Sequence, residues 1–403
     1  MGIFSMYERQ LWVLVTVSFI HSLGTSIAFP FISLYLYQHR GISMTEVGLL
    51  LMVSAAIGGL FQIVSGELCD RVGRKALMIA GTLLQCIGFL LLAISIIYGL
   101  GYMEFFIFLV VLEIAIGLYY NVPSIMTSDI AGPEKQNGAF SLTCMGSNMG
   151  FAVGPVCGGL IAMFSYSAMF FMTAIISFIC MSVCICLLND TKPGMARRSP
   201  VPIRRTVFGD RPFLLFCCIS LILWVVYAQI LTTLSSYTGS FVHISESSIG
   251  LLFSINGLMI ILFQYPITRC FERFRLTTSL AAGSIMFALG FGALGLCNSF
   301  EALAGCIIVI TLGELIFIPP SLTIVAQMST PEFRGRYMSI AGLMGGAGFS
   351  IGPFLGGLLM DVFYTRITMM WFTIGALAVF CMVGFLCLRS RISESADRPS
   401  LTV

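Results

Sequence analysis

Long stretches without charged residues recur along this sequence and restrict its fold more than any other feature. No Asp, Glu, Lys or Arg occurs between Arg9 and Arg40 or between Lys75 and Glu104. Five further stretches of this kind cover 212–245, 247–268, 276–300, 337–360 and 367–388. Because a membrane-spanning helix needs about 20 mostly apolar residues, each stretch predicts one crossing.

Composition supports the same conclusion. The 403 residues are 58% hydrophobic and 10% charged, against about 45–50% and about 25% in soluble domains. The uncharged stretch 136–189 is too long for one crossing, and its polar break at Ser165-Tyr166-Ser167 predicts a helical hairpin. The sequence therefore predicts an all-α membrane protein whose twelve spans cover about 11–37, 46–68, 76–98, 103–127, 139–163, 167–188, 213–237, 247–268, 277–297, 302–327, 338–360 and 367–388.

The distribution of basic residues predicts the orientation. Of the 21 Lys and Arg residues, all but Arg40 and Arg366 fall on the side of the two termini. Since basic residues accumulate in cytoplasmic loops, we expect both termini in the cytoplasm and the protein in the plasma or inner membrane. The net charge of +3 then follows from topology, and we expect no nucleic-acid partner.

The first apolar stretch could be mistaken for a signal peptide, and the cysteines for a disulfide or metal framework. The first apolar stretch contains Pro30 and lacks a small-residue cleavage site, so we expect it to be retained. The 14 cysteines lie almost entirely within predicted spans or on the cytoplasmic side, where thiols stay reduced. We therefore expect neither a metal site nor a disulfide framework.

The second half of the sequence repeats the first. Pro133-Glu134 is followed by Gly150, Gly154-Pro155 and Gly158-Gly159, and Pro331-Glu332 by Gly348, Gly352-Pro353 and Gly356-Gly357 with every spacing kept. A second echo pairs Gly48-Leu49-Leu50, Phe61-Gln62 and Asp70-Arg71 with Gly250-Leu251-Leu252, Phe263-Gln264 and Glu272-Arg273. Such duplication predicts two related bundles with a substrate site between them.

The segment between the halves is rich in proline and basic residues, which is typical of a solvated linker. The expected organisation is an N-terminal six-helix bundle (1–188), a cytoplasmic basic linker (189–212), a C-terminal six-helix bundle (213–388) and a cytoplasmic tail (389–403).

The loop after the second span carries a compact glycine and charge motif. It reads Gly66-Glu67-Leu68-Cys69-Asp70-Arg71-Val72-Gly73-Arg74-Lys75. This resembles the loop 2–3 signature of the major facilitator superfamily, and the resemblance extends over essentially the full chain. It implies that Asp70 latches against Arg336–Ser339 at the start of span eleven, with Gly66, Arg71, Gly73, Arg74 and Lys75 completing the motif. The alternative is that the basic residues only keep this loop cytoplasmic.

The glycine and proline run of span five is similar to a motif of the drug/proton antiporter branch of that superfamily. The resemblance implies a helix bend that favours export, formed by Gly150, Gly154, Pro155, Gly158, Gly159 and, in the second copy, Gly352, Pro353, Gly356 and Gly357. Ordinary close packing is the alternative, since small residues let helices approach and proline bends them.

Two acidic residues lie near the middle of predicted spans, Glu113 in span four and Glu314 in span ten. Because ionisable groups in a bilayer are costly, such residues indicate function, and we predict that both couple transport to protons. In the resembled fold they would face one cavity. A protonated acid bonded to a neighbouring helix is the alternative for each. His21, in span one, is a third proton-coupling candidate, or a structural histidine.

Polar and aromatic residues near these acids are the candidates for a substrate cavity. Helical spacing places Tyr120 and Asn121 near Glu113 and Phe317 near Glu314, and span seven adds Trp224, Tyr227 and Gln229. No cationic side chain lies inside a span, which disfavours organophosphate substrates.

We therefore predict a secondary active transporter, working by alternating access, that exports lipophilic or cationic small molecules in exchange for protons. A metabolite importer or facilitator of the same fold, and a transport-dead receptor or scaffold, are the alternatives. We expect a monomer in the lipid bilayer, without enzymatic activity, cofactor or metal, since the sequence has no phosphate-binding glycine loop, metal-ligand cluster or nucleophile with a base.

Overall fold

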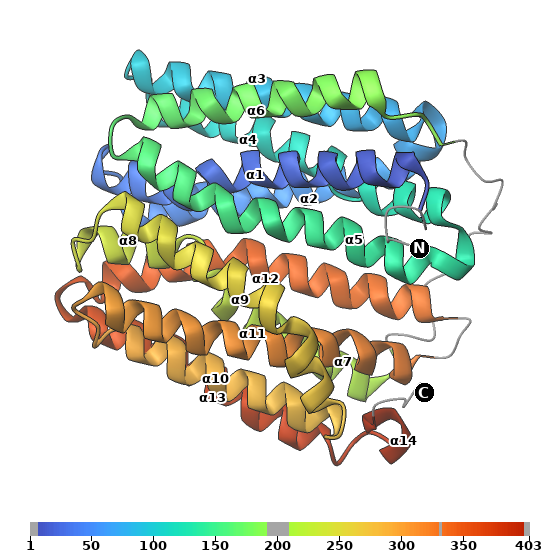
Figure 1. Cartoon of the computed structure of the whole chain (residues 1–403). Helices are drawn as coiled ribbons and strands as arrows, with labels where there is room; N and C mark the ends of the chain where they lie inside the picture. The colour runs from blue at the N-terminus through green and yellow to red at the C-terminus, as the bar shows by residue number, and fades with distance from the viewer. Residues whose placement is uncertain (1–6, 192–208, 330–332, 399–403) are drawn as a thin grey trace. The chain divides into compact units, whose positions relative to one another are not determined.

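The computed structural model describes residues 7–191, 209–329 and 333–398, and all regular secondary structure in these ranges is helical (Figure 1). In chain order the helices are α1 (Arg9–Gln38), α2 (Met44–Val72), α3 (Arg74–Ile97), α4 (Tyr102–Tyr120), α5 (Val122–Ala162), α6 (Tyr166–Leu187), α7 (Arg211–Ala228), α8 (Thr233–Ser240), α9 (Glu246–Phe271), α10 (Leu276–Leu294), α11 (Phe300–Met328), α12 (Arg334–Val362), the 3₁₀ turn η2 (Tyr364–Arg366), α13 (Ile367–Leu388) and α14 (Glu394–Asp397).

Twelve segments of the described chain are long and apolar enough to cross a membrane, which confirms the predicted fold class. Two of these segments are broken. The fourth, Tyr102–Ala131, breaks between α4 and α5, where Pro123 supplies no backbone N–H. The seventh, Arg211–Ser240, breaks between α7 and α8. There the Gln229 side chain donates to the Val225 carbonyl oxygen at 2.7 Å, while the Gln229 backbone N–H bonds to Val226 instead.

The chain divides into two compact units that do not coincide with its two halves. Unit 1 comprises Met1–Arg40, Leu50–Arg197 and His243–Ile261, and unit 2 comprises Gly41–Leu49, Arg198–Val242 and Leu262–Val403. The first turn of α2 therefore belongs to unit 2, and most of α9 belongs to unit 1.

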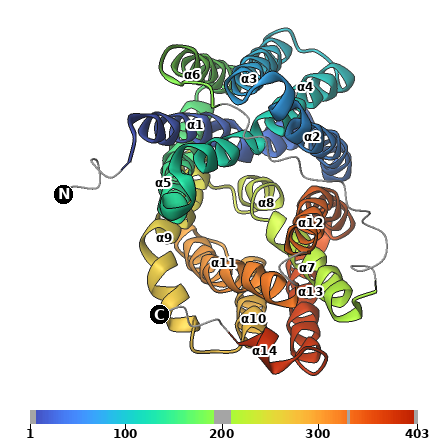
Figure 2. The ribbon, with the colours of Figure 1, turned by 90° about the vertical axis from the view of Figure 1, so that its right-hand side faces the viewer.

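Each unit has its own core. In unit 1, α1 packs against α5 and α6, and α3 packs against α4 and α6. Leu14, Met78, Tyr119 and Cys180 meet in its centre. In unit 2, α7 packs against α12 and α13, and α10 packs against α11 and α13 (Figure 2). Trp371 and Phe385 are fully buried there.

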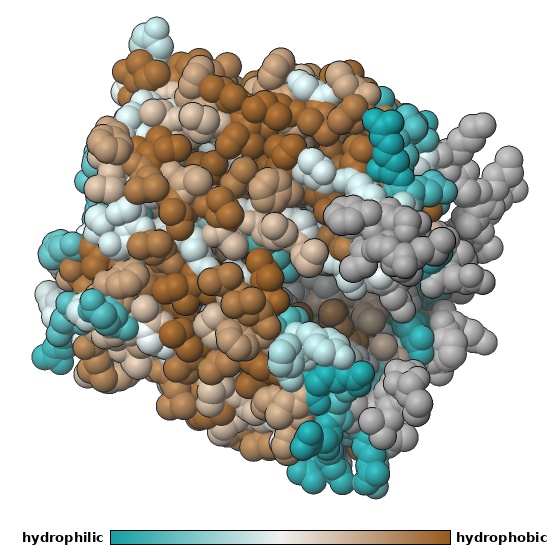
Figure 3. All heavy atoms as spheres, in the orientation of Figure 1, coloured by the Kyte–Doolittle hydropathy of each residue, from teal (hydrophilic) through white to brown (hydrophobic). Residues whose placement is uncertain are grey.

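Large apolar side chains also cover the outer flanks of the helices. On α6, Phe171 and Phe178 are exposed, and on α13 Phe372 and Phe380 are exposed. Figure 3 shows hydrophobic residues along the flanks of the helices and hydrophilic residues at their ends. Such surfaces suit contact with lipid chains.

In each half of the chain, an aspartate beyond the last long helix caps an earlier helix. Asp190, after α6, accepts a hydrogen bond from the Lys75 backbone N–H at the start of α3 (3.1 Å). Asp397, in α14, accepts from the Thr277 backbone N–H and hydroxyl at the start of α10 (both 2.8 Å). Carboxylates at these positions satisfy helix N–H groups and favour the positive end of the helix dipole.

One of the two ion pairs of Glu394, the pair with Arg275, ties α14 to the rest of unit 2. Glu394 pairs with Arg398 at 2.7 Å and with Arg275 at 3.0 Å. The hydrogen bond and charge of Arg398, followed by the charge of Arg275, hold the pKa of Glu394 below its ordinary value.

Candidate transport site

The buried acid of unit 2 has a defined partner. Glu314 lies on α11 and is 7% exposed. The Tyr227 hydroxyl, from α7, donates a hydrogen bond to its carboxylate. A hydrogen bond to a carboxylate in a buried setting is stronger than one between neutral groups. The structure therefore brings together two residues that the sequence predicted separately.

Tyr227 belongs to an aromatic cluster. It consists of Trp224, Tyr227, Phe287, Phe317 and Phe349, with ring centroids of neighbouring members 5.7 to 6.4 Å apart. Its residues come from α7, α10, α11 and α12, so four helices converge here. The faces of aromatic rings attract cations, and their surfaces accept apolar groups.

Phe287 and Phe349 are members of the aromatic cluster that the sequence analysis missed. Phe349 lies among the glycines of α12, where the lone aromatic side chain between residues 338 and 353 was an available signal. A Cβ atom added at Gly345 or Gly348 would approach Trp224 to 3.2 or 2.8 Å. Gly345 therefore makes room for the indole ring, and Gly348 lets α12 approach the backbone of α7.

Gln229, predicted as a cavity residue, is fully used by protein contacts. Its amide nitrogen donates to the carbonyl oxygens of Val225 and Gly352, and its amide oxygen accepts from the Thr233 hydroxyl (2.6 Å). Gln229 therefore links α7 to α12 across the break in the seventh span. Its role in substrate binding stays a prediction.

The acid of unit 1 lies where two helices pack closely. Glu113 is 8% exposed. A Cβ atom added at Gly58 of α2 would lie 3.2 Å from the Cβ atom of Glu113. One turn along α4, Gly117 approaches the Gly58 carbonyl oxygen so closely that a Cβ atom would overlap it. Glu113 therefore sits on the face of α4 that packs against α2, and its role in proton coupling stays a prediction.

His21 stacks on Tyr119 in the core of unit 1. The ring centroids are 3.7 Å apart and the planes are nearly parallel at 9°. Within the described chain, His21 Nε2 and the Tyr119 hydroxyl are buried without a hydrogen-bond partner. Tyr119, which the sequence analysis did not single out, is thus the neighbour of His21, whereas Tyr120 is 64% exposed. Asn121 donates to the Gln62 carbonyl oxygen at 3.0 Å.

The loop after α2 is anchored inside unit 1. The buried Arg74 side chain pairs with Asp129 of α5 at 3.2 Å and donates to the Cys69 carbonyl oxygen. Lys75 Nζ donates to the carbonyl oxygen of Ile185 at 2.8 Å, and Gly73 has a φ of 102° that favours glycine. Gly66 and Arg71 lie at the end of α2, and the side chain of Asp70 lies outside what the structure describes. The latch therefore stays a prediction.

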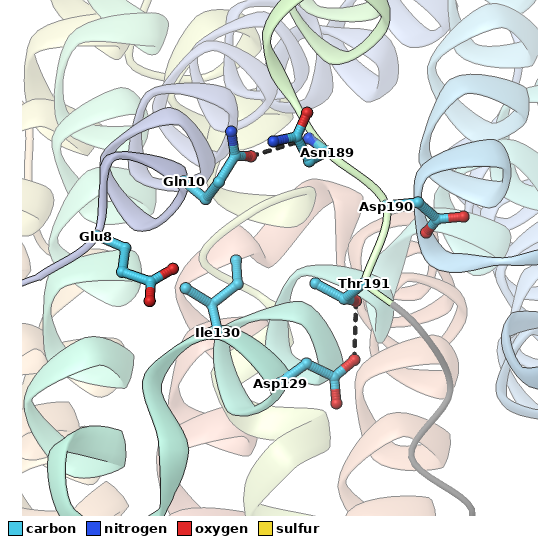
Figure 4. Close-up of a pocket in the computed structure, with 7 residues that line it drawn as sticks. All are labelled: Glu8, Gln10, Asp129, Ile130, Asn189, Asp190 and Thr191. Carbon is cyan, nitrogen blue, oxygen red and sulfur yellow. Dashed lines mark hydrogen bonds between the residues drawn. The ribbon is translucent and has the colours of Figure 1, made fainter.

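A shallow acidic pocket of about 350 Å³ lies beside this loop (Figure 4). Its lining residues are Glu8, Gln10, Asp129, Ile130, Asn189, Asp190 and Thr191. Asp129 accepts from Thr191 at 2.8 Å, and the Gln10 amide oxygen accepts from the Asn189 backbone at 2.9 Å. Several of its polar groups thus hold the chain after α6 in place.

The repeated glycine motif packs two equivalent helix pairs. In unit 1 a Cβ atom at Gly150, Gly154 or Gly158 of α5 would collide with α1, and one at Gly159 would collide with Glu246 of α9. In unit 2 a Cβ atom at Gly352 or Gly356 of α12 would collide with α7 or α8, and one at Gly357 with Met44 of α2. Pro155 and Pro353 lie in the same helices. These contacts are close packing, and the link to export stays a prediction.

A carboxylate contact that the sequence analysis missed joins α12 to the first turn of α2. Asp361 accepts from the backbone N–H groups of Met44 (3.2 Å) and Thr45 (2.7 Å), and from the Thr45 hydroxyl (2.6 Å). The backbone N–H of Ser43 donates to the Glu46 carboxylate, and the backbone N–H of Glu46 donates to the Ser43 hydroxyl oxygen. This pair of bonds is a capping box. Every backbone N–H of the first turn is therefore bonded without water.

Twelve apolar spans, two buried acids within them and an aromatic cluster that contacts one acid through Tyr227 define an integral membrane protein built to pass small molecules. The sequence profile of the Major Facilitator Superfamily matches residues 14–242 and 230–401. The chain belongs to this superfamily of transporters, which confirms the resemblance drawn from the sequence.

Individual relatives cover most of the chain. It is 27% identical over 89% of its length to the uncharacterized MFS-type transporter YttB of Bacillus subtilis (strain 168), of which 90% is covered. It is 26% identical over 84% of its length to the multidrug resistance protein MdtH of Salmonella arizonae, of which 83% is covered. A crystal structure of a POT family transporter in complex with 5-aminolevulinic acid superposes with a TM-score of 0.82 at 16% identity, covering 98% of both chains. This last likeness concerns the fold alone.

Proposed function

We propose that this transporter exports lipophilic or cationic small molecules in exchange for protons. Glu314 and the aromatic cluster of unit 2 would bind the substrate, and Glu314 and Glu113 would carry protons. The observation that carries the proposal is the buried Glu314 carboxylate, hydrogen-bonded to Tyr227, which is itself a member of the aromatic cluster.

The chemistry of this cluster favours an amphipathic substrate. Aromatic faces bind flat apolar groups and attract positive charge, and a carboxylate among them adds a specific partner for an amine. A carboxylate can also take up a proton when the cation leaves, which is the exchange that antiport requires. The relative MdtH is named a multidrug resistance protein, and this name supports export as the direction of transport.

The proposal also covers the organisation and orientation of the protein in the membrane. The protein would lie as a monomer in the plasma or inner membrane, with both termini cytoplasmic and the bundles 1–188 and 213–388 joined by the linker 189–212. Alternating exposure of the site would drive export, with Asp70 as the predicted latch. The charge distribution supports this orientation.

The test is transport by purified protein in lipid vesicles. Lipophilic cations and neutral drugs are offered with and without an imposed proton gradient, and Glu314→Gln and Glu113→Gln are compared with the parent. The matched control is Glu301→Gln, an exposed acid at the start of the same helix as Glu314. We expect at least a tenfold loss of gradient-driven flux in Glu314→Gln, since a coupled proton step requires a titrating group, and little change in the control.

Each outcome has a definite meaning. Unchanged flux in both core variants would reject the assignment of the acids as proton carriers. Transport that ignores the gradient would favour a facilitator, and accumulation of metabolites in place of drugs would favour an importer of the same fold.

A further inference from the structure

We propose that Cys297 and Cys306 form a disulfide bond that closes one end of the α10–α11 hairpin. Their sulfur atoms lie 3.4 Å apart as free thiols, and both residues are buried. Cys297 is in the short connection between the two helices, and Cys306 lies in the second turn of α11. A disulfide requires the separation of the two sulfur atoms to close to about 2.05 Å.

The surrounding structure holds this connection in place. The Tyr237 hydroxyl of α8 donates to the Leu294 carbonyl oxygen at 3.0 Å, and the Thr368 hydroxyl of α13 donates to the Gly295 carbonyl oxygen at 2.9 Å. On the other side, Gly290 allows α10 to approach the Cys306 backbone, where a Cβ atom would lie 3.2 Å from the carbonyl oxygen. These contacts hold the backbone just before Cys297 and place α10 beside the backbone of Cys306.

The position of the pair along the membrane normal decides its redox environment. The α10–α11 connection lies at the opposite end of α10 from Thr277, which is capped by Asp397 of the C-terminal tail. With the tail cytoplasmic, as in the proposed orientation on which this inference rests, Cys297 lies at the outer face. Disulfides persist there, whereas cytoplasmic thiols are kept reduced.

The bond forms by thiol–disulfide exchange. During folding, before packing buries the pair, the thiolate of the loop residue Cys297 attacks a disulfide of a thiol oxidoreductase or a low-molecular-weight disulfide outside the membrane, and one thiolate leaves. Cys306 then attacks the mixed disulfide and releases the second thiolate. The two cysteines lose two protons and two electrons, and the external disulfide is reduced to two thiols.

The bond would stiffen the helix that carries the candidate site. Glu314 follows Cys306 by about two turns of α11. A cross-link over so short a loop limits the freedom of the hairpin in the unfolded chain and holds its outer end in the folded chain.

The experiment is differential alkylation of the parent protein in native membranes. Membranes are denatured in a first alkylating agent, reduced, treated with an isotopically heavy agent and analysed by peptide mass spectrometry. We expect Cys297 and Cys306 to carry only the heavy label, and a cross-linked peptide to appear when reduction is omitted. The internal control is Cys180 with Cys184, a buried pair on α6 near its cytoplasmic end under the proposed orientation.

Variants and outcomes complete the test. In Cys297→Ser the remaining Cys306 should take the first label, and in Cys306→Ser the same should hold for Cys297. If both cysteines of the parent take the first label, the proposal is wrong. It is also wrong if both are protected from the first label but no cross-linked peptide appears, because each would then be modified on its own. Orientation is measured independently by a reporter fused to the C-terminus, so an inverted topology is distinguished from an unbonded outer pair.

Discussion

Gln229 shows how one side chain can hold a broken helix in place. Its amide joins Val225, Gly352 and Thr233 across the gap between α7 and α8. Gln229→Leu would leave the buried Gly352 carbonyl oxygen and the Thr233 hydroxyl without this partner. We expect the free energy of unfolding to fall by about 1–3 kcal/mol, measured as a lower melting temperature of the protein in detergent.

Thr233→Val is the matched control, because it removes only one of the three bonds and keeps the side-chain shape. Its melting temperature should fall less than that of Gln229→Leu. If Gln229→Leu melts like the parent but loses substrate binding, Gln229 belongs to the cavity, as its sequence position suggested.

Single residues also show where sequence reasoning ends. The burial of Glu113 and Glu314 could be predicted, because a charge inside an apolar stretch has no other place in a span. Their neighbours could not, because helical periodicity gives the face of one helix and leaves open which helix meets it. Phe287 joins the aromatic cluster through Tyr227 of α7 and Phe317 of α11, and Phe349 joins it through two aromatic residues of α7.

At the scale of elements, the capping of α2 by Asp361 is the contact with the clearest test. Asp361→Ala removes a carboxylate that accepts from two backbone N–H groups of the first turn of α2. We expect a loss of about 0.5–2 kcal/mol, as for removal of a helix cap. Hydrogen exchange should become faster at the amides of Met44 and Thr45, while the start of α3 stays unchanged.

Thr45→Val separates the side-chain bond from the capping bonds. It removes the hydroxyl donor but leaves both backbone N–H groups on Asp361, so amide protection should persist. Equal exchange in Asp361→Ala and the parent would show that water replaces the carboxylate without cost.

The spans themselves were predictable, but their interruptions were not. Apolar length alone identified the twelve crossings, and the break at Ser165 agrees with α5 ending at Ala162 and α6 beginning at Tyr166. The break after Ala228 depends on a side chain competing for a backbone carbonyl oxygen. A hydropathy profile does not reveal such competition, because it does not depend on hydrogen bonds between side chains and the backbone.

At the scale of the whole molecule, the internal repeat could be predicted from the sequence where the residue spacing is the same in both halves. It could not be predicted where that spacing differs. The glycine motifs of α5 and α12 keep their spacing and make equivalent contacts. Asp190 and Asp397 play the same capping role in the two units, yet Asp190 follows Lys75 by 115 residues and Asp397 follows Thr277 by 120. The capping role is therefore kept although the spacing is not.

The last prediction uses the two copies of the glycine motif as mutual controls. Gly159 meets the Glu246 carbonyl oxygen at the start of α9, and Gly357 meets the Met44 carbonyl oxygen at the start of α2. Gly159→Ala and Gly357→Ala place a methyl group on backbone that cannot yield like a side chain. We expect each to lower the free energy of unfolding by about 1–3 kcal/mol, as in other overpacked sites.

Gly342→Ala, on the same helix as Gly357, provides the comparison, because a Cβ atom there meets nothing within 4 Å. Melting temperatures measured in detergent should fall together for the two motif variants and stay near the parent for Gly342→Ala. A fall in only one motif variant would mean that the repeat is kept in sequence but is used differently in the two units. Equal falls would mean that docking of the first turns of α2 and α9 is a shared structural requirement, which a transporter with two related bundles has to satisfy twice.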